Sequence, residues 1–296
     1  MNGYERYKSK KWLSVSAMNN FCRCPRLYFY RQGCRLASPS KMAPLVFGGC
    51  IHKGLPYAFK GDIKKAMEAF CEDWDPDLND DKRNMVRANG MFMNFYESHR
   101  EGRSIYNPIP SPANRAKSED HNGEYEVPFA VDIGLDVPLV GLVDCLARHR
   151  DTEDLVVVEY KTTSQLGGMF LGSFGLSPQV LVYMLAIKTL TGEEVELAFV
   201  EGLLVAKVSH NTAVIPIYVK DFQIKETLEW ITTTYNKILA CEEKENFPKD
   251  FSGCNSYSGF GMPGYTCPFA PLCSTTEDWQ DLDDMYIVKE ERLSPY

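Results

Sequence analysis

The sequence predicts an α/β protein in which helices flank a central β-sheet. Short apolar runs with strand character and longer apolar stripes with helical spacing both occur along the chain. We expect strands at 124–132, 196–206 and 212–219, and two strands within 139–163. Two helices are expected within 62–100 with a break at 75–77, further helices at 178–186 and 222–245, and a loop at 107–123. An apolar content of 44% over 296 residues is ordinary for a globular protein with a sizeable core.

The segment Leu139–Thr163 reads as two strands joined by a turn over His149–Asp154. The second strand begins with Leu155–Val158, a continuous apolar run rich in β-branched residues. Such a run is typical of a strand that is buried on both faces. We therefore expect this hairpin to lie at the centre of the fold.

The polar end of this second strand is the first candidate site. Side chains alternate along a strand, so Glu159 and Lys161 share a face and Tyr160 points away from it. A turn centred near residues 151–152 places Asp144 opposite Glu159. Two carboxylates and an ammonium at the edge of an apolar core are costly unless they are compensated, and a divalent metal ion would compensate them. The alternative is a surface hairpin with solvated ends.

Two other segments carry polar residues of similar chemistry. Val46–Gly54 reads as a glycine-containing turn followed by a helix with His52, which is either a metal ligand or a structural histidine. Pro178 begins a helix in which Gln179 and Tyr183 are four residues apart and share one face. On an otherwise apolar helix, this pair faces either a site or solvent.

Ten cysteines are many for a chain in which no secretion signal or transmembrane-length apolar run is apparent. We expect a cytoplasmic protein, in which disulfides are disfavoured. Cys254, Cys267 and Cys273 lie in a Gly/Pro-rich stretch with 12 and five residues between them, and a bound metal would hold such a stretch together. Cys22 or Cys24 would supply a fourth thiolate. Four thiolates suit zinc or an iron–sulfur cluster, and unrelated buried thiols are the alternative.

The charge is distributed unevenly. The net charge of −8 disfavours a protein that coats nucleic acid by bulk electrostatics. Residues 1–35 are nevertheless rich in Lys and Arg, and residues 275–296 are acidic. A basic arm and an acidic tail fit local contact with a polyanion, with a merely solvated arm as the alternative.

These motifs occur in the order found in one family of nucleases. The chain resembles the RecB-type branch of the PD-(D/E)XK nucleases, in the version whose iron–sulfur cluster joins the two chain ends. CRISPR-associated RecB-like exonucleases, the AddB nuclease domain and phage-encoded proteins are relatives of that kind. The resemblance covers nearly the whole chain and rests on Cys24–Tyr30, Gly49–His52, Gly141–Asp144, Glu159–Thr162, Gln179–Tyr183, and Phe247–Pro248 with Cys254, Cys267–Phe269 and Cys273. Each motif alone is weak, whereas six in one order are specific.

The resemblance implies a mixed central β-sheet flanked by helices, which is a restriction-endonuclease-like core. It adds a helical insertion and a metal-cluster clasp that joins the N- and C-terminal segments. A single nuclease domain over 1–296 would then comprise a basic arm with the first cysteine (1–35), a helical insertion (55–105), a catalytic core (124–220), a cysteine cluster (247–274) and an acidic tail (275–296).

The resemblance also implies hydrolysis of phosphodiester bonds in DNA. Mg²⁺ or Mn²⁺ would be held by His52, Asp144, Glu159 and the Tyr160 backbone carbonyl. Lys161 would position or activate the attacking water, and Gln179 and Tyr183 would line the site and contact the strand. A 4Fe–4S cluster, with Zn²⁺ as the alternative, would be held by Cys24, Cys254, Cys267 and Cys273. Glu126 would assist from outside the ligand set.

We therefore expect an exonuclease that acts on DNA ends or single strands in repair, recombination or phage DNA processing. We expect it in the cytoplasm of a bacterial host, with a protein partner in a recombination or repair complex. The second hypothesis is a non-catalytic, zinc-stapled DNA-binding or assembly subunit. The complete set of Asp144, Glu159 and Lys161 favours the enzyme. The sequence leaves open the polarity of cleavage, strandedness, exonuclease or endonuclease action, and the oligomeric state.

Overall fold

The computed structural model describes residues 7–39, 41–100, 102–110, 124–255, 267–274 and 285–289. The chain divides into two compact units. Residues 41–129 and 141–224 form the first, here called the sheet unit, and residues 1–40, 130–140 and 225–296 form the second, here called the end unit. No helix in the described ranges is long and apolar enough to cross a membrane.

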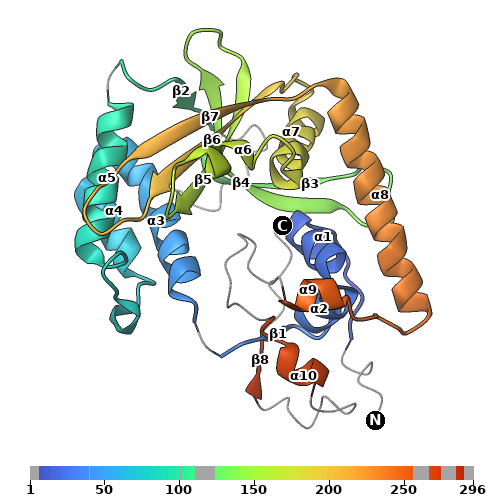
Figure 1. Ribbon diagram of the computed structural model, residues 1–296. Helices are drawn as coiled ribbons and strands as arrows, with labels where there is room; N and C mark the ends of the chain where they lie inside the picture. The colour runs from blue at the N-terminus through green and yellow to red at the C-terminus, as the bar shows by residue number, and fades with distance from the viewer. Residues whose placement is uncertain are drawn as a thin grey trace. The chain divides into compact units, whose positions relative to one another are not determined.

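The sheet unit is built on a mixed β-sheet of six strands in the order β2-β4-β5-β6-β7, with β3 also paired to β4 (Figure 1). The parallel pair is β5–β6, whereas β2–β4, β4–β5 and β6–β7 are antiparallel. The strands are β2 (Tyr106–Pro108), β3 (Tyr125–Val131), β4 (Leu139–His149), β5 (Leu155–Thr163), β6 (Leu197–Leu204) and β7 (Thr212–Tyr218). The expected mixed sheet flanked by helices is therefore confirmed.

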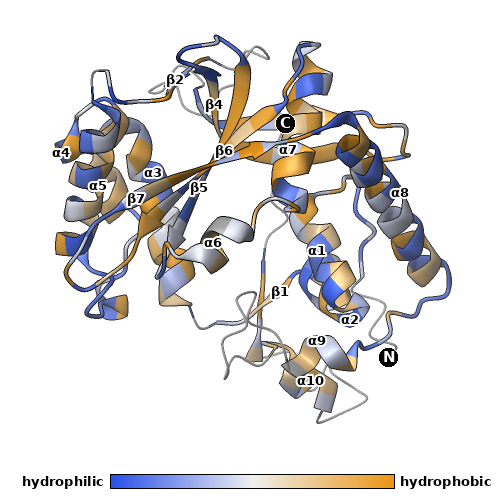
Figure 2. Ribbon diagram, turned by 45° about the horizontal axis from the view of Figure 1, so that its top comes forward, coloured by the Kyte–Doolittle hydropathy of each residue, from blue (hydrophilic) through white to orange (hydrophobic). Residues whose placement is uncertain are grey.

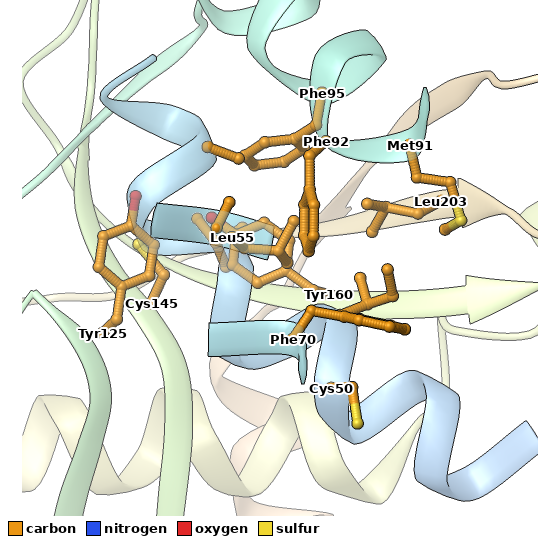
Figure 3. Packing of buried hydrophobic residues seen from close by; sticks show 14 of the residues in the cluster. Cys50, Leu55, Phe70, Met91, Phe92, Phe95, Tyr125, Cys145, Tyr160 and Leu203 are labelled. Carbon is orange, nitrogen blue, oxygen red and sulfur yellow. The ribbon is translucent and has the colours of Figure 1, made fainter. Parts of the chain in front are cut away.

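One face of the sheet is covered by α3 (Ala43–Phe59), α4 (Ile63–Cys71) and α5 (Met85–His99), which pack against one another. The strands contribute alternate residues to this core, among them Val156, Val158 and Tyr160 of β5. Figure 3 shows aromatic side chains of the helices, such as Phe92 and Phe95, packed around Tyr160. The core on this face is therefore aromatic-rich and meets the middle of β5.

The insertion between these helices follows the sequence pattern closely. Asp62 and Asn84 cap α4 and α5 with side-chain hydrogen bonds to backbone N–H groups. A 3₁₀ turn, Pro76–Leu78, occupies the expected break between the two helices. The expected loop at 107–123 starts later than predicted, because Asn107 and Pro108 belong to β2; residues 111–123 lie outside the described ranges.

Helix α3 corrects one expectation. Gly48 and Gly49 were expected to form a turn before the helix of His52, but both lie inside α3, which starts at Ala43 with Pro44 in its first turn. A Cβ atom on Gly48 would lie 3.0 Å from Thr162 Oγ1. A glycine at position 48 thus permits close packing of α3 on the end of β5 rather than a change of chain direction.

Helix α7 (Pro178–Thr191) contacts β5, and the short α6 (Gly168–Gly172) precedes it. Pro178 begins α7 and Gly192, with a φ of 71°, ends it, so the helix extends beyond the predicted 178–186. Figure 2 shows α7 as one of the most hydrophobic helices. Gln179 is therefore a polar residue on a largely apolar helix.

The end unit contains α1 (Val15–Arg23), α2 (Pro25–Tyr28), a π-helical turn (Phe29–Gly33), β1 (Leu36–Ala37), most of α8 (Asp221–Glu243), α9 (Phe251–Asn255), α10 (Ala270–Ser274) and β8 (Ile287–Val288). Strands β1 and β8 pair antiparallel, with Leu36 opposite Val288. Segments from both ends of the chain therefore pair within this unit. Of the predicted acidic tail at 275–296, only 285–289 lies within the described ranges.

Candidate active site and cysteine pocket

Strands β4 and β5 bring two carboxylates together. Their register pairs Cys145 with Val158, so the next residues along, Asp144 and Glu159, lie opposite each other as the sequence predicts. Opposed residues of an antiparallel pair direct their side chains to the same face of the sheet. The backbone N–H of Tyr160 donates a hydrogen bond to Asp144 Oδ2 at 2.9 Å.

Helix α7 completes this cluster with Gln179. The Gln179 amide nitrogen donates to Glu159 Oε1 at 2.8 Å and to the Tyr183 hydroxyl at 3.0 Å. The Lys161 ammonium donates to Gln179 Oε1 at 3.1 Å and also to Glu159 Oε1. Gln179 and Tyr183 therefore face the site, and the alternative of a solvent-facing pair on α7 does not hold.

Glu159 is buried, whereas the Lys161 side chain is about one-third exposed. Burial and the neighbouring Asp144 carboxylate raise the pKa of Glu159 to about 8, against the opposing effect of Lys161. Burial alone would also raise the pKa of Asp144, but His52, Lys161 and the Tyr160 N–H outweigh it, so this pKa is lowered. The two carboxylates are thus driven to different protonation states at neutral pH.

His52 reaches the same cluster from α3. Its Nδ1 lies 3.6 Å from Asp144 Oδ1, the carboxylate oxygen that the Tyr160 N–H does not bind. Burial lowers the pKa of His52, but the Asp144 and Glu159 carboxylates outweigh it, so the net shift is upward. His52 therefore faces the site rather than serving the core alone.

As placed, the described residues include no group of three or more His, Cys, Asp or Glu side chains that would hold a metal ion. Instead, His52 lies against Asp144 and Lys161 lies against Glu159. The donor chemistry still fits a hard divalent cation, since carboxylate oxygens are its preferred ligands. Glu159 Oε2 is buried without a hydrogen-bond partner, an open acceptor position in the middle of the cluster. Glu126 is exposed on β3, and no hydrogen bond or ion pair joins it to the described members of this cluster.

A second candidate site lies in the end unit, where four cysteines line one pocket. Cys24 comes from the junction of α1 and α2, Cys254 from α9, Cys273 from α10, and Cys267 precedes α10. Within this Gly/Pro-rich stretch, Cys254 and Cys273 lie in short helices, and residues 256–266 are outside the described ranges.

Hydrogen bonds tie the two chain ends around this pocket. The Asp250 N–H contacts Cys24 Sγ at 3.3 Å, and Lys249 donates to the Cys273 carbonyl at 2.6 Å. The Arg26 guanidinium donates to the Phe247 carbonyl at 2.7 Å. Cys22 is exposed, and its Sγ faces Thr234 Oγ1 at 3.7 Å instead.

Three of the pocket thiols are held in the neutral form in the absence of a ligand. Burial is the main cause that raises the pKa of Cys267 to about 11 and also raises the pKa of Cys254 and Cys273. The neighbouring cysteines add to the shift in each case. Metal binding at this pocket would therefore release protons.

One polar cluster was missed by reading the sequence. His99, Tyr106 and Glu201 are buried on the face of the sheet opposite Glu159 and Lys161, where they meet Tyr160. Glu201 is the signal that could have found it, because it interrupts the apolar strand LAFVEGLL. A carboxylate inside such a strand needs a buried partner.

The candidate active site is thus a pair of opposed carboxylates and a lysine on neighbouring strands of a mixed α/β sheet. Residues 12–274 match the family model of the PD-(D/E)XK nuclease superfamily. The chain belongs to this superfamily, as the motifs predict. No curated protein matches the sequence.

Two solved structures show limited likeness. A crystal structure described as "Putative exonuclease" from Eubacterium rectale has 15% identity and a TM-score of 0.48, with 90% of this chain and 94% of that chain covered. The structure of SSO0001 has 13% identity and a TM-score of 0.33, with 78% of each chain covered. At these values neither likeness bears on the activity.

Proposed function

We propose that the protein is a metal-dependent deoxyribonuclease that acts as an exonuclease on DNA ends or single strands. The observation that carries this proposal is the convergence of Asp144, Glu159 and Lys161 in a chain of the PD-(D/E)XK nuclease superfamily. The RecB-type branch is the proposed subgroup, and repair, recombination or phage DNA processing is the proposed setting.

The proposed ligands of Mg²⁺ or Mn²⁺ are Asp144, Glu159, His52 and the Tyr160 carbonyl. When bound, such an ion polarises a phosphoryl oxygen and makes water a stronger nucleophile. Glu159 offers its unpartnered Oε2, and Asp144 offers Oδ1. Glu159 must first lose its proton, and the adjacent Lys161 ammonium favours that loss.

Lys161 is the proposed catalytic cation. An ammonium has three N–H donors, and two are directed at Glu159 Oε1 and Gln179 Oε1. The third remains for a phosphate oxygen or for the attacking water. Because these two acceptors fix the ammonium in place, it can stabilise negative charge on the phosphate without reorganising.

The remaining contacts to DNA are proposed from chemistry and charge. Gln179 and Tyr183 line the site from α7 and would contact the strand being cleaved. The basic N-terminal segment would bind backbone phosphates, a contact that weakens with salt.

The cysteine pocket is the proposed site of a 4Fe–4S cluster, with Zn²⁺ as the alternative. Its ligands would be Cys24, Cys254, Cys267 and Cys273, which line one pocket in the end unit. Cys24 is preferred to Cys22 because the Cys22 thiol faces Thr234. Such a cluster would join segments from the two ends of the chain.

Cleavage of end-labelled DNA tests the enzyme. Linear and circular substrates, each single- and double-stranded, are incubated with Mg²⁺ or Mn²⁺; degradation confined to linear substrates supports an exonuclease. Asp144→Ala and Lys161→Ala should abolish cleavage, whereas Asp151→Ala and Lys64→Ala, at exposed positions, serve as matched controls. Full activity of either site variant would overturn the assignment, and DNA binding without cleavage by the wild type would favour the non-catalytic subunit.

Metal analysis after anaerobic purification tests the cysteine site. Iron and sulfide with visible absorbance support the iron–sulfur cluster. A colourless, iron-free protein loaded with zinc would replace it by the zinc alternative.

A further inference from the structure

A chain of buried polar side chains lies behind the candidate active site. It contains His99 of α5, Tyr106 of β2, Tyr160 of β5 and Glu201 of β6. Glu201 and Tyr106 have no exposed surface, Tyr160 is 1% exposed and His99 is 7% exposed. Four buried residues from four different elements thus meet within the sheet unit.

Hydrogen bonds link the side chains of Tyr160, Tyr106 and Glu201. The Tyr106 hydroxyl donates to Glu201 Oε2 at 2.8 Å. A phenol has one proton, so Tyr106 accepts its second bond, at 3.1 Å, from the Tyr160 hydroxyl. His99 Nε2 approaches the same Glu201 oxygen at 3.2 Å.

The other nitrogen of His99 fixes its orientation. His99 Nδ1 lies 2.9 Å from the Phe95 carbonyl and 3.0 Å from the Ser98 hydroxyl. Aromatic rings also enclose the imidazole, with Phe95 at 4.3 Å and Phe59 at 5.1 Å between ring centroids. His99 is therefore a fixed partner for Glu201 rather than a mobile one.

Stability alone does not account for these groups. A buried polar network often adds nothing over an apolar set of the same volume, because desolvation offsets the attraction between its members. Glu201 Oε1 is buried without a hydrogen-bond partner, which makes the cluster more costly still. An apolar alternative is close by in this same core, where Phe92 and Phe95 pack around Tyr160 (Figure 3).

This row of buried polar side chains ends at Tyr160, directly behind the candidate active site. Tyr160 lies between Glu159 and Lys161, whose side chains point to the opposite face of β5. The Tyr160 backbone N–H binds Asp144 Oδ2. Tyr160 is also opposite Glu201 in the parallel β5–β6 register. Holding the Tyr160 side chain from behind therefore holds the backbone from which the site residues project.

We propose that His99, Glu201 and Tyr106 are positioning residues that anchor Tyr160 and thereby set the geometry of the Asp144–Glu159 metal platform. This inference rests on the proposed metal-dependent nuclease function. It assigns no contact with substrate to any of the three residues. Their effect is exerted through Tyr160 alone, in the way that partners of ligating residues tune metal sites.

Mn²⁺ binding measured by electron paramagnetic resonance, without DNA and well below the unfolding temperature, tests the proposal. Tyr106→Phe removes one hydroxyl from β2 and leaves both carboxylate strands unchanged. We expect the Kd for Mn²⁺ to rise about tenfold, as for changes to the partners of metal ligands. The Mg²⁺ concentration for half-maximal cleavage should rise in parallel, while the KM for DNA stays the same and saturating metal restores most of kcat.

Phe70→Leu is the matched control, because Phe70 belongs to the same core but takes no part in the polar chain. It should lower the unfolding temperature and leave the Mn²⁺ Kd unchanged. Glu201→Gln provides the same readout if Tyr106→Phe does not fold. A wild-type Kd in these variants, with stability lowered as in Phe70→Leu, would overturn the proposal. A wild-type protein that binds no Mn²⁺ would instead overturn the nuclease function on which it rests.

Discussion

The hydrogen bond from the Tyr160 N–H to Asp144 Oδ2, 2.9 Å long, joins the main chain of β5 to a side chain of β4. It fixes one oxygen of the carboxylate and leaves the other, Oδ1, facing His52. The opposite residue, Glu159, keeps its own Oε2 without a partner. The pair therefore combines rigid carboxylates with open oxygens.

Glu159→Gln is expected to stabilise the metal-free protein at alkaline pH while it abolishes metal-dependent cleavage. Burial, reinforced by Asp144, raises the pKa of Glu159 to about 8 from the ordinary 4.5. Above pH 8 the ionised group therefore costs folding free energy, on the order of a few kcal/mol, and a neutral amide removes that cost. Urea unfolding with EDTA at pH 9 measures the difference in the free energy of unfolding between Glu159→Gln and the wild type. A variant less stable than the wild type would contradict this account.

The pH dependence has a definite sign. Between pH 4.5 and 8 the folded protein holds the Glu159 proton and the unfolded chain does not. The contribution of Glu159 to the free energy of unfolding is thus complete below pH 4.5 and is lost as the pH rises through 8. Urea titrations of wild type and Glu159→Gln across this range should diverge in that direction.

Metal binding should show the opposite dependence, because the ion requires the ionised carboxylate. Its affinity is expected to rise by up to about tenfold per pH unit below pH 8 and then level off. The raised pKa of His52 acts in the same direction, whereas the lowered pKa of Asp144 leaves that group already ionised. Calorimetric titration with Mn²⁺ in two buffers of different ionisation enthalpy measures the released proton. An affinity that is constant from pH 6 to pH 8 would contradict the prediction.

Gln179→Ala should lower kcat by about 10–100-fold with little loss of stability, because it removes a hydrogen-bonding partner of a ligating carboxylate. Gln179 also orients Lys161 through its Oε1 and contacts the Tyr183 hydroxyl. Single-turnover cleavage at saturating DNA and metal measures the effect, and the exposed Gln165→Ala is the control. An equal rate for both variants would remove Gln179 from the site.

Much of the sheet and of this site could be predicted from local sequence. The β-branched run of β5 indicates a buried strand, and residue alternation with the turn at 151–152 predicts that Asp144 faces Glu159. The start of α3 was harder to predict. Glycine is needed at position 48 because the helix approaches Thr162 closely there, and these two segments are more than 100 residues apart in the sequence.

The polar chain behind β5 could not be predicted for the same reason. His99 and Glu201 come from a helix and a strand whose contact depends on the packing of the whole sheet unit. Reading Glu201 alone predicts that a partner exists, but not which one. Side-chain pairs set by tertiary packing lie beyond the helical and strand periodicities that sequence reading uses.

Cys22 and Cys24 are close in the sequence but differ in their surroundings. Cys24 lines the pocket with Cys254, Cys267 and Cys273, whereas the exposed Cys22 faces Thr234. Cys24→Ser should reduce bound iron or zinc to background and lower the unfolding temperature by about 10 °C or more. Each kcal/mol of unfolding free energy that is lost corresponds to roughly 2–4 °C in a protein of this size or slightly smaller. Cys22→Ser should retain the metal and unfold like the wild type. Metal analysis and thermal unfolding of the anaerobically purified variants measure both effects, and metal loss in Cys22→Ser with retention in Cys24→Ser would reverse the assignment.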